Sequence, residues 1–180
     1  VEGKRTENFS FRTDPNLLLN RGLVNYIPAM SKVNTYRLTS RYNPATQFMG
    51  EVAFQFDVQY KFNKKVSALV NYSHINSLED VKLYREIYGE VTYKPNKNNN
   101  FIIGLQRQVY NQFVYEGKVN APNVETYVPF LEYLHKFNKK TAIRLEGSAM
   151  FTDQDYGSWV YGLAEFTIAP HWSFVVSDMY

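Results

Sequence analysis

Two absences bound what this chain can be: it contains no cysteine and no long apolar run. Without cysteine there are no disulfide bonds and no thiolate metal sites. A membrane-spanning helix needs roughly 18 or more consecutive apolar residues, and no stretch of the sequence approaches that length. These absences exclude a disulfide-stapled protein and a helical membrane protein.

A large excess of charge of one sign is missing as well. The sequence has 20 basic and 17 acidic side chains, which leaves a formal net charge of +3. So small an excess gives no electrostatic argument for nucleic acid as a partner. The opening residues, Val1-Glu2-Gly3-Lys4-Arg5, are not a signal peptide, so we expect a mature form or an internal fragment.

Aromatic residues, in contrast, are abundant. They make up 17% of the 180 residues, with Tyr 15 and Phe 13, although the mean hydropathy is −0.41. That combination is unusual for a soluble helical domain. The length is enough for one domain with a substantial folded interior.

Period-two alternation dominates from about Thr35 onward and is clearest from Glu51 to Phe62. Every even position there is apolar or aromatic, and every odd position except Ala53 is polar, which predicts a strand with two unlike faces. The other predicted strands are Thr35–Tyr42, Val66–Ile75, Val81–Lys94, Phe101–Gln112, Val124–Phe137, Thr141–Thr152, Ser158–Ala169 and Trp172–Tyr180.

Short turns and longer links alternate between these strands, which is typical of an up-and-down antiparallel meander. Phe-Asn-Lys-Lys occurs at two of the short turns, at 62–65 and 137–140. We divide the chain into an N-terminal segment, 1–34, and β-barrel strands, 35–180. In the first part we expect a short strand at Phe9–Thr13 and a short helix after Asp14-Pro15 that ends near Gly22.

Strands with one apolar face fit either a soluble barrel, with that face inward, or a membrane barrel, with that face toward lipid. The length of the strands, about ten residues or more, favours the membrane barrel, as do the aromatic residues beside the turns and the charges of both signs on the polar face. The predicted lumen-facing polar residues are Glu51, Asp57, Lys61, Glu86, Glu90, Arg144, Glu146 and Glu165. The predicted lipid-facing or girdle residues are Phe54, Phe56, Tyr60, Phe62, Tyr93, Phe101, Phe137 and Trp172.

Short Asn-Lys-Lys turns after an aromatic residue, joined to Tyr-rich strands, resemble outer-membrane barrels of Bacteroidetes-type bacteria. The segments Ile27-Pro28-Ala29, Thr35-Tyr36-Arg37-Leu38, Asn43-Pro44-Ala45-Thr46-Gln47 and Gly50-Glu51 are similar to an uncharacterised family of such barrels. Members of that family are longer than this chain. The resemblance therefore implies a segment of a larger barrel, and it implies no activity.

No set of residues forms a catalytic or metal-binding motif. His74, His135 and His171 lie in different hairpins, and neither Ser148 nor Ser177 lies in a nucleophile elbow. An outer-membrane lipase or protease, whose site assembles from separate strands, stays as a minor alternative.

Paired carboxylates and a loose calcium loop are the remaining candidates for chemistry. Glu86 and Glu90 share one face of a strand and suit either a cation or acid–base work, but we favour a lumen network neutralised by Arg144 or Lys61. Asp153-Gln154-Asp155 lacks EF-hand spacing, so we favour a surface turn.

Two arginines fall on the predicted lipid face. A midplane arginine costs about 2–4 kcal/mol there, and one near an interface about 0–1. Arg85 and Arg107 therefore lie near an interface, beside a bulge, or against a protein partner.

We predict an all-β, antiparallel transmembrane barrel or part of one, with about 8–10 strands present. The predicted function is a non-enzymatic barrel in the cell outer membrane that acts as a channel for small polar solutes. One alternative is a structural or accessory barrel, with a plugged lumen, in a larger outer-membrane complex. Another is a soluble β-sandwich binding module. The predicted partners are outer-membrane lipid and other outer-membrane proteins, with no cofactor and no metal.

Overall fold

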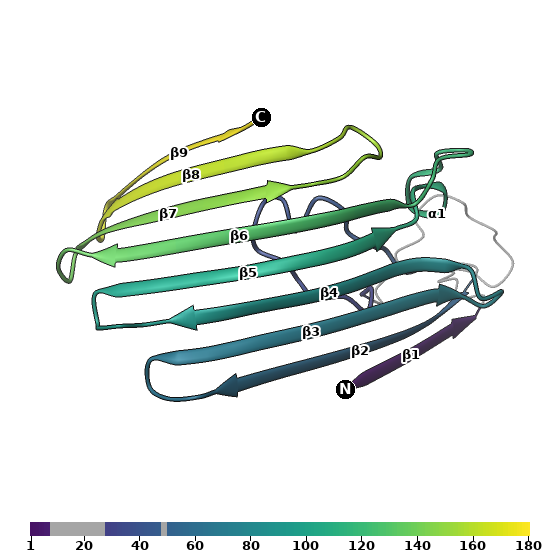
Figure 1. Ribbon diagram of the computed structural model, residues 1–180, viewed down its shortest axis with the longest axis horizontal. Helices are drawn as coiled ribbons and strands as arrows, with labels where there is room; N and C mark the ends of the chain where they lie inside the picture. The colour runs from purple at the N-terminus through teal and green to yellow at the C-terminus, as the bar shows by residue number, and fades with distance from the viewer. Residues whose placement is uncertain (8–27, 48–49) are drawn as a thin grey trace, which may run out of the picture.

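The computed structural model describes residues 1–7, 28–47 and 50–180. Within them nine strands form one sheet, in which the spatial order follows the chain order and neighbours are antiparallel (Figure 1). The strands are β1 (Glu2–Glu7), β2 (Gly50–Lys61), β3 (Val66–Ser77), β4 (Lys82–Tyr93), β5 (Asn99–Tyr110), β6 (Val124–Lys136), β7 (Thr141–Met150), β8 (Trp159–Ile168) and β9 (Trp172–Met179). A short helix, α1 (Gln112–Glu116), links β5 to β6. The predicted all-β meander is confirmed.

The sheet is open, because β1 and β9 each pair on one side only within the described part of the chain. None of the described helices has the length and apolar character needed to cross a membrane. Strands β2 to β9 each lie within two residues of the ranges that alternation predicted. Strand β1 was not predicted, and the strand and helix expected between residues 9 and 22 lie outside the described residues.

The prediction of a strand at Thr35–Tyr42 is wrong. This stretch forms turns, in which the backbone N–H of Ser40 donates to Tyr36 O and that of Arg41 to Leu38 O. Its alternation has another cause: Tyr36, Leu38 and Tyr42 are buried against the sheet while Arg37 and Arg41 are exposed. The boundary drawn after residue 34 also does not separate the sheet from the rest, since β1 precedes it and the next strand begins at Gly50.

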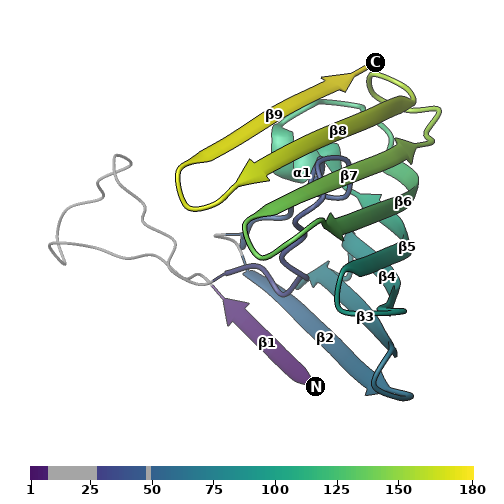
Figure 2. The same ribbon diagram turned by 90° about the vertical axis from the view of Figure 1, so that its left-hand side faces the viewer.

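Residues 28–47, which we call the inner segment, lie on the concave side of the curved sheet (Figure 2). Buried apolar residues of the inner segment and of the sheet's concave face form the core. One cluster contains Leu38, Tyr42, Ala53, Ile75, Leu83, Tyr84, Tyr110, Val124, Val128 and Met150, and a second contains Tyr36, Tyr88 and Phe130. Strand β6 carries apolar residues at both parities for this reason: its concave face packs on the core while its other face stays apolar.

Apart from a register shift between Ile75 and Asn76 in the β3–β4 pairing, the strand pairing keeps the two faces of the sheet separate. Phe56 lies opposite Tyr72, which lies opposite Ile87, and this row is on the convex face. The next row, Asp57 opposite Asn71, is on the concave face. Because residues directly opposite each other in a sheet share a face, the alternation in β2 propagates from strand to strand.

The two ends of the sheet differ. One end carries short turns, at 62–65, 94–98, 137–140 and 169–171, and we call it the turn end. The other end carries the longer links at 78–81, 111–123 and 151–158, with α1 among them, and we call it the loop end (Figure 1).

Candidate functional site

The concave face collects the polar residues that the sequence singled out. Glu51, Asp57, Lys61, Glu86, Glu90, Arg144, Glu146 and Glu165 all lie on it by register and parity. The girdle residues Phe54, Phe56, Tyr60, Phe62, Tyr93, Phe101, Phe137 and Trp172 lie on the convex side or in the turns, and all but the half-buried Phe101 are exposed. The concave face is therefore the place to look for a site.

A buried polar network fixes the inner segment to the sheet. Oε1 of Glu86 accepts hydrogen bonds from Nδ2 of Asn34 at 2.7 Å and from Nε2 of Gln106 at 2.6 Å. The same amide nitrogen of Gln106 donates to Thr39 O at 2.9 Å. Glu86 is only 1% exposed, and its other oxygen has no partner in the described structure. A carboxylate of the wall thus holds the inner segment through neutral donors.

A second glutamine, Gln108, two residues further along β5, makes a similar pair of contacts. Nε2 of Gln108 donates to Tyr42 O at 2.8 Å and to the hydroxyl of Tyr84 at 2.7 Å. Two glutamines at the same parity of β5 therefore satisfy two carbonyl groups of the inner segment, Thr39 and Tyr42. Buried backbone carbonyls need such partners, so the inner segment depends on this wall for its shape.

A buried ion pair clamps both ends of the inner segment. Nζ of Lys4 in β1 lies 2.6 Å from Oε1 of Glu51 in β2, and it also donates to Pro28 O at 3.0 Å and to the Thr46 hydroxyl at 2.7 Å. The other oxygen of Glu51 accepts from the backbone N–H of Gln47 at 3.1 Å. The side chains of Lys4 and Glu51 are 10% and 0% exposed.

Arg144 organises the acidic residues in the middle of the concave face. Its guanidinium lies 2.9 Å from Glu165, 3.4 Å from Glu132 and 3.4 Å from Glu146. The prediction that Arg144 or Lys61 neutralises Glu86 and Glu90 is wrong, because Glu86 accepts from neutral amides and Glu90 accepts from the Tyr88 hydroxyl at 2.5 Å. Lys61 forms no ion pair among the described residues.

Asp155 ties three segments together at the loop end. Its carboxylate accepts from Nζ of Lys118 at 2.6 Å and from the hydroxyl of Tyr42 at 2.9 Å. Partial burial raises the pKa of Asp155, but the hydrogen bonds from Lys118 and Tyr42 outweigh it and hold the pKa below the ordinary value. With its carboxylate engaged in this way, Asp155 belongs to a structural contact rather than to a calcium loop.

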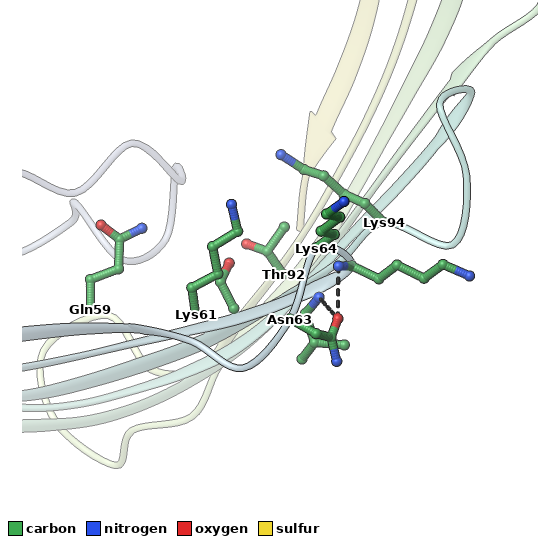
Figure 3. A pocket seen from close by; sticks show the side chains of 9 residues that line it. Gln59, Lys61, Asn63, Lys64, Thr92 and Lys94 are labelled. Atoms are coloured by element: carbon green, nitrogen blue, oxygen red, sulfur yellow. Dashed lines mark hydrogen bonds between the residues drawn. The ribbon is translucent and has the colours of Figure 1, made fainter.

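A basic groove lies at the turn end, around the β2–β3 turn (Figure 3). Its volume is about 400 Å³, and its charged lining residues are Lys61, Lys64, Lys65 and Lys94. Gln59, Lys61 and Thr92 point to one side of the sheet, and that is the concave side by register. The groove contains no acidic lining residue.

The candidates for catalysis or metal binding are not brought together. Within residues 1–7, 28–47 and 50–180, no group of three or more His, Cys, Asp or Glu side chains is arranged to hold a metal ion. His74 contacts the Tyr72 hydroxyl at 3.3 Å, and His135 contacts Oδ1 of Asn99 at 2.8 Å. His171 lies in the β8–β9 turn.

Arg85 and Arg107 lie on the convex side toward the loop end. Arg85 lies beside a register shift in the β3–β4 pairing, and its guanidinium donates to Ile75 O at 3.0 Å, Tyr84 O at 2.7 Å and Oδ1 of Asn76 at 2.7 Å. Arg107 pairs with Glu125 at 3.8 Å and covers the ring of Tyr127.

Sequence reasoning missed the residues that bind the inner segment: Lys4, Asn34, Gln106 and Gln108. A signal was present for Gln106 and Gln108, because both occupy the polar parity of β5. No local pattern marks Lys4 or Asn34, whose partners lie 47 and 52 residues away in sequence.

The fold and this site define a class: an all-β protein built on one open antiparallel meander, with a polar concave face occupied by a segment of its own chain. The whole chain, residues 1–180, matches a family described as a family of unknown function (DUF6029), and the protein belongs to that family. No curated protein and no solved structure matches the chain.

Proposed function

We propose that the nine-stranded sheet is part of the wall of an outer-membrane β-barrel, with its convex face in lipid. The observation that carries this proposal is an exposed apolar convex face behind a concave face that buries charged and amide side chains beside its core. Glu51, Glu86 and Gln106 are buried on the concave face, whereas Phe54 and Val58 are each 42% exposed on the convex face. The outward-facing positions of a soluble barrel or sandwich are polar instead, because its apolar faces pack inward.

Strand length and aromatic placement support the same proposal. Strands β2 to β5 each have 12 residues, and a tilted transmembrane strand needs about 9–11. Tyr60 and Trp172, close to the turn end, are 60% and 64% exposed, which suits rings at the level of lipid headgroups.

Within the described residues, β1 and β9 each have one edge without a neighbouring strand, and these two edges bear on the size of the barrel. An open sheet edge in the hydrocarbon region leaves backbone N–H and C=O groups without partners, and each such group costs several kcal/mol. A membrane-embedded sheet with these two edges needs further strands to close it. We therefore propose a larger barrel, to which this sheet contributes one arc.

Of the predicted functions, the geometry favours a structural or accessory barrel with a filled lumen. The inner segment crosses the concave face and is held by the Glu86 network, by the two glutamines of β5 and by the Lys4–Glu51 pair. A segment bonded at so many points obstructs the passage of solutes along the wall.

A channel for small polar solutes is the second candidate. It is favoured by the part of the concave face near the turn end, where Asp57, Gln59 and Lys61 are exposed. If the other side of the barrel leaves a gap beside the inner segment, these side chains line an aqueous path.

Fractionation of the cell envelope, followed by a heat-modifiability gel of the detergent-extracted full-length protein, tests the proposal. Recovery in the outer membrane with a boiling-dependent mobility shift supports a barrel. Recovery in the soluble fraction without detergent contradicts it. Planar-bilayer conductance then separates the two functions, because a filled barrel is silent and copurifies with partners whereas a channel conducts ions.

A further inference from the structure

Three turns at the turn end repeat one chemical pattern. Each carries an aromatic residue followed by a pair of lysines: Phe62 before Lys64 and Lys65, Tyr93 before Lys94 and Lys97, and Phe137 before Lys139 and Lys140. We call these six lysines the lysine rim. All are exposed, and none forms an ion pair within the described part of the chain.

The lysine side chains are not needed to form the turns. Oδ1 of Asn63 accepts from the backbone N–H groups of Lys65 at 2.7 Å and Val66 at 3.0 Å. Oδ1 of Asn138 accepts from Lys140 N at 2.8 Å and from Thr141 N at 3.0 Å. In the turn between β4 and β5, Oδ1 of Asn96 accepts from the backbone N–H groups of Asn98 and Asn99 in the same way. The asparagine side chains therefore fix the backbone, which leaves the ammonium groups available for a partner.

The position of the lysine rim indicates what that partner is. The exposed rings of Phe62, Tyr93 and Phe137 lie next to it, where the apolar convex face ends. On the proposed function, which this inference assumes, these rings lie at the boundary between hydrocarbon and headgroups. Lysines just beyond that boundary extend their ammonium groups into the headgroup layer.

We propose that the lysine rim binds the phosphate groups of anionic phospholipids in the leaflet at the turn end. Each ammonium group supplies three donors and a full positive charge to a phosphate oxygen. The lysines are spread over three turns rather than converging on one point, which fits several lipid headgroups better than one soluble anion. Two grooves gather some of these lysines: the one in Figure 3 is lined by Lys61, Lys64, Lys65 and Lys94, and a second one, of about 210 Å³, is lined by Lys94, Lys97 and Lys136.

The chain provides its own reporter for a test. It has two tryptophans, and Trp172 is the one that is exposed on the convex face beside the β8–β9 turn. That turn adjoins the lysine rim, because the backbone N–H of Ala169 donates to Lys140 O at 2.7 Å. In a W159F variant of the full-length protein, Trp172 becomes the sole tryptophan of this region.

The experiment measures quenching of Trp172 in phosphatidylcholine vesicles that contain either brominated phosphatidylglycerol or brominated phosphatidylcholine. We expect stronger quenching by the anionic lipid, with the preference lost in 1 M sodium chloride because salt screens exposed charges. In the K139Q/K140Q variant, the affinity for phosphatidylglycerol relative to phosphatidylcholine should fall roughly fivefold for each lysine removed. K82Q, which removes an exposed lysine at the loop end, should leave the preference unchanged.

Equal quenching by the two lipids in W159F, or an unchanged preference in K139Q/K140Q, overturns the assignment of the lysine rim while leaving the membrane proposal intact. If inorganic phosphate abolishes the preference for the anionic lipid but sodium chloride of equal ionic strength does not, the lysines bind a soluble anion. That result also overturns the assignment of the lysine rim to lipid. Absence of quenching by both brominated lipids contradicts the membrane location itself. A second reporter, F62W in a W159F/W172F background, checks the first turn independently, and adding K64Q/K65Q to it should cause the same loss of preference.

Discussion

Nδ2 of Asn34 donates a hydrogen bond of 2.7 Å to Oε1 of Glu86, across 52 residues of sequence. Asn34 belongs to the inner segment and is half-buried, and Glu86 is a buried residue of the wall, so this bond joins the two parts of the molecule at a site largely shielded from water. Shielded polar contacts are directional and costly to leave unmade. They therefore specify one position of the inner segment more sharply than apolar packing alone does.

Loss of the Gln106 amide should loosen the inner segment. Gln106→Leu keeps the volume but leaves Thr39 O without its donor and removes one of the two donors to Glu86. We expect the free energy of unfolding to fall by about 1–3 kcal/mol, the cost of a buried unsatisfied polar group. Denaturant unfolding measures it, and trypsin cleavage at the exposed Arg37 and Arg41 should accelerate.

The matched control is Gln59→Leu, on the same concave face but exposed and without a hydrogen bond in the described structure. Its free energy of unfolding should stay within about 0.5 kcal/mol of the wild type. Equal effects of the two substitutions would mean that the Gln106 contacts do not hold the inner segment.

The Lys4–Glu51 pair should behave as a buried ion pair, whose members depend on each other. Lys4→Met removes the cation and leaves the Glu51 carboxylate buried without a charge partner, which costs about 3–5 kcal/mol. Replacing both, as in K4M/E51L, should recover much of that loss because no unpaired charge is left. A double-mutant cycle on denaturant unfolding gives the coupling free energy. A coupling near zero contradicts the clamp.

Acid should weaken the contact at Asp155. The folded-state pKa of this carboxyl lies below its ordinary value of 3.8, so the ionised form favours folding. The sign follows: its stabilising contribution is fully present above about pH 4, and it is lost as the pH falls through the lower folded-state pKa. The stability difference between the wild type and Asp155→Asn, measured by urea unfolding, should shrink as the pH falls below 4. A difference that stays constant from pH 6 to pH 3 would exclude an ionised Asp155 as its source.

Gly104 should tolerate no side chain. A Cβ built there would overlap the ring of Phe130 and lie 2.7 Å from Gly89 O, and the latter atom belongs to the backbone of the neighbouring strand. Gly104→Ala should therefore lower the free energy of unfolding by about 1–3 kcal/mol. Gly147→Ala in β7 is the control, because a Cβ there meets nothing within 4 Å. Equal stability of the two variants would show that the sheet relaxes around the added methyl group.

The sequence predicted the sheet well because its signal is local. Alternation in β2 and the Asn-Lys-Lys turns depend on residues a few positions apart, and the structure has both. Thr35–Tyr42, in the middle of the inner segment, was predicted as a strand, since Tyr36, Leu38 and Tyr42 alternate with polar residues in either conformation. What decides between them is the Gln106 and Gln108 amides, which lie more than 60 residues away in sequence.

The charge network shows the same limit. Parity alone placed Arg144, Glu146 and Glu165 on one face, and the structure brings them into contact. Parity did not indicate which acid each cation meets, because that depends on the strand order and on the inner segment. For this reason the sequence predicted Arg144 or Lys61 as the partner of Glu86, whereas its partners in the structure are the side-chain amides of Asn34 and Gln106.

A charge in the middle of the convex face should discriminate between lipid and water as its surroundings. Leu105 lies near the centre of β5 on this face and is 44% exposed, while Val160 lies toward the loop end of β8, opposite Ala149. In a bilayer, Leu105→Arg should cost about 2–4 kcal/mol and Val160→Arg about 0–1, because the cost of an arginine falls toward the interface. Folding titrations of the full-length protein in lipid vesicles give both values. In water, an exposed substitution usually changes stability by less than about 0.5 kcal/mol. Two small and equal effects would therefore place the convex face in solvent, and a large difference between the two positions would place it in the membrane.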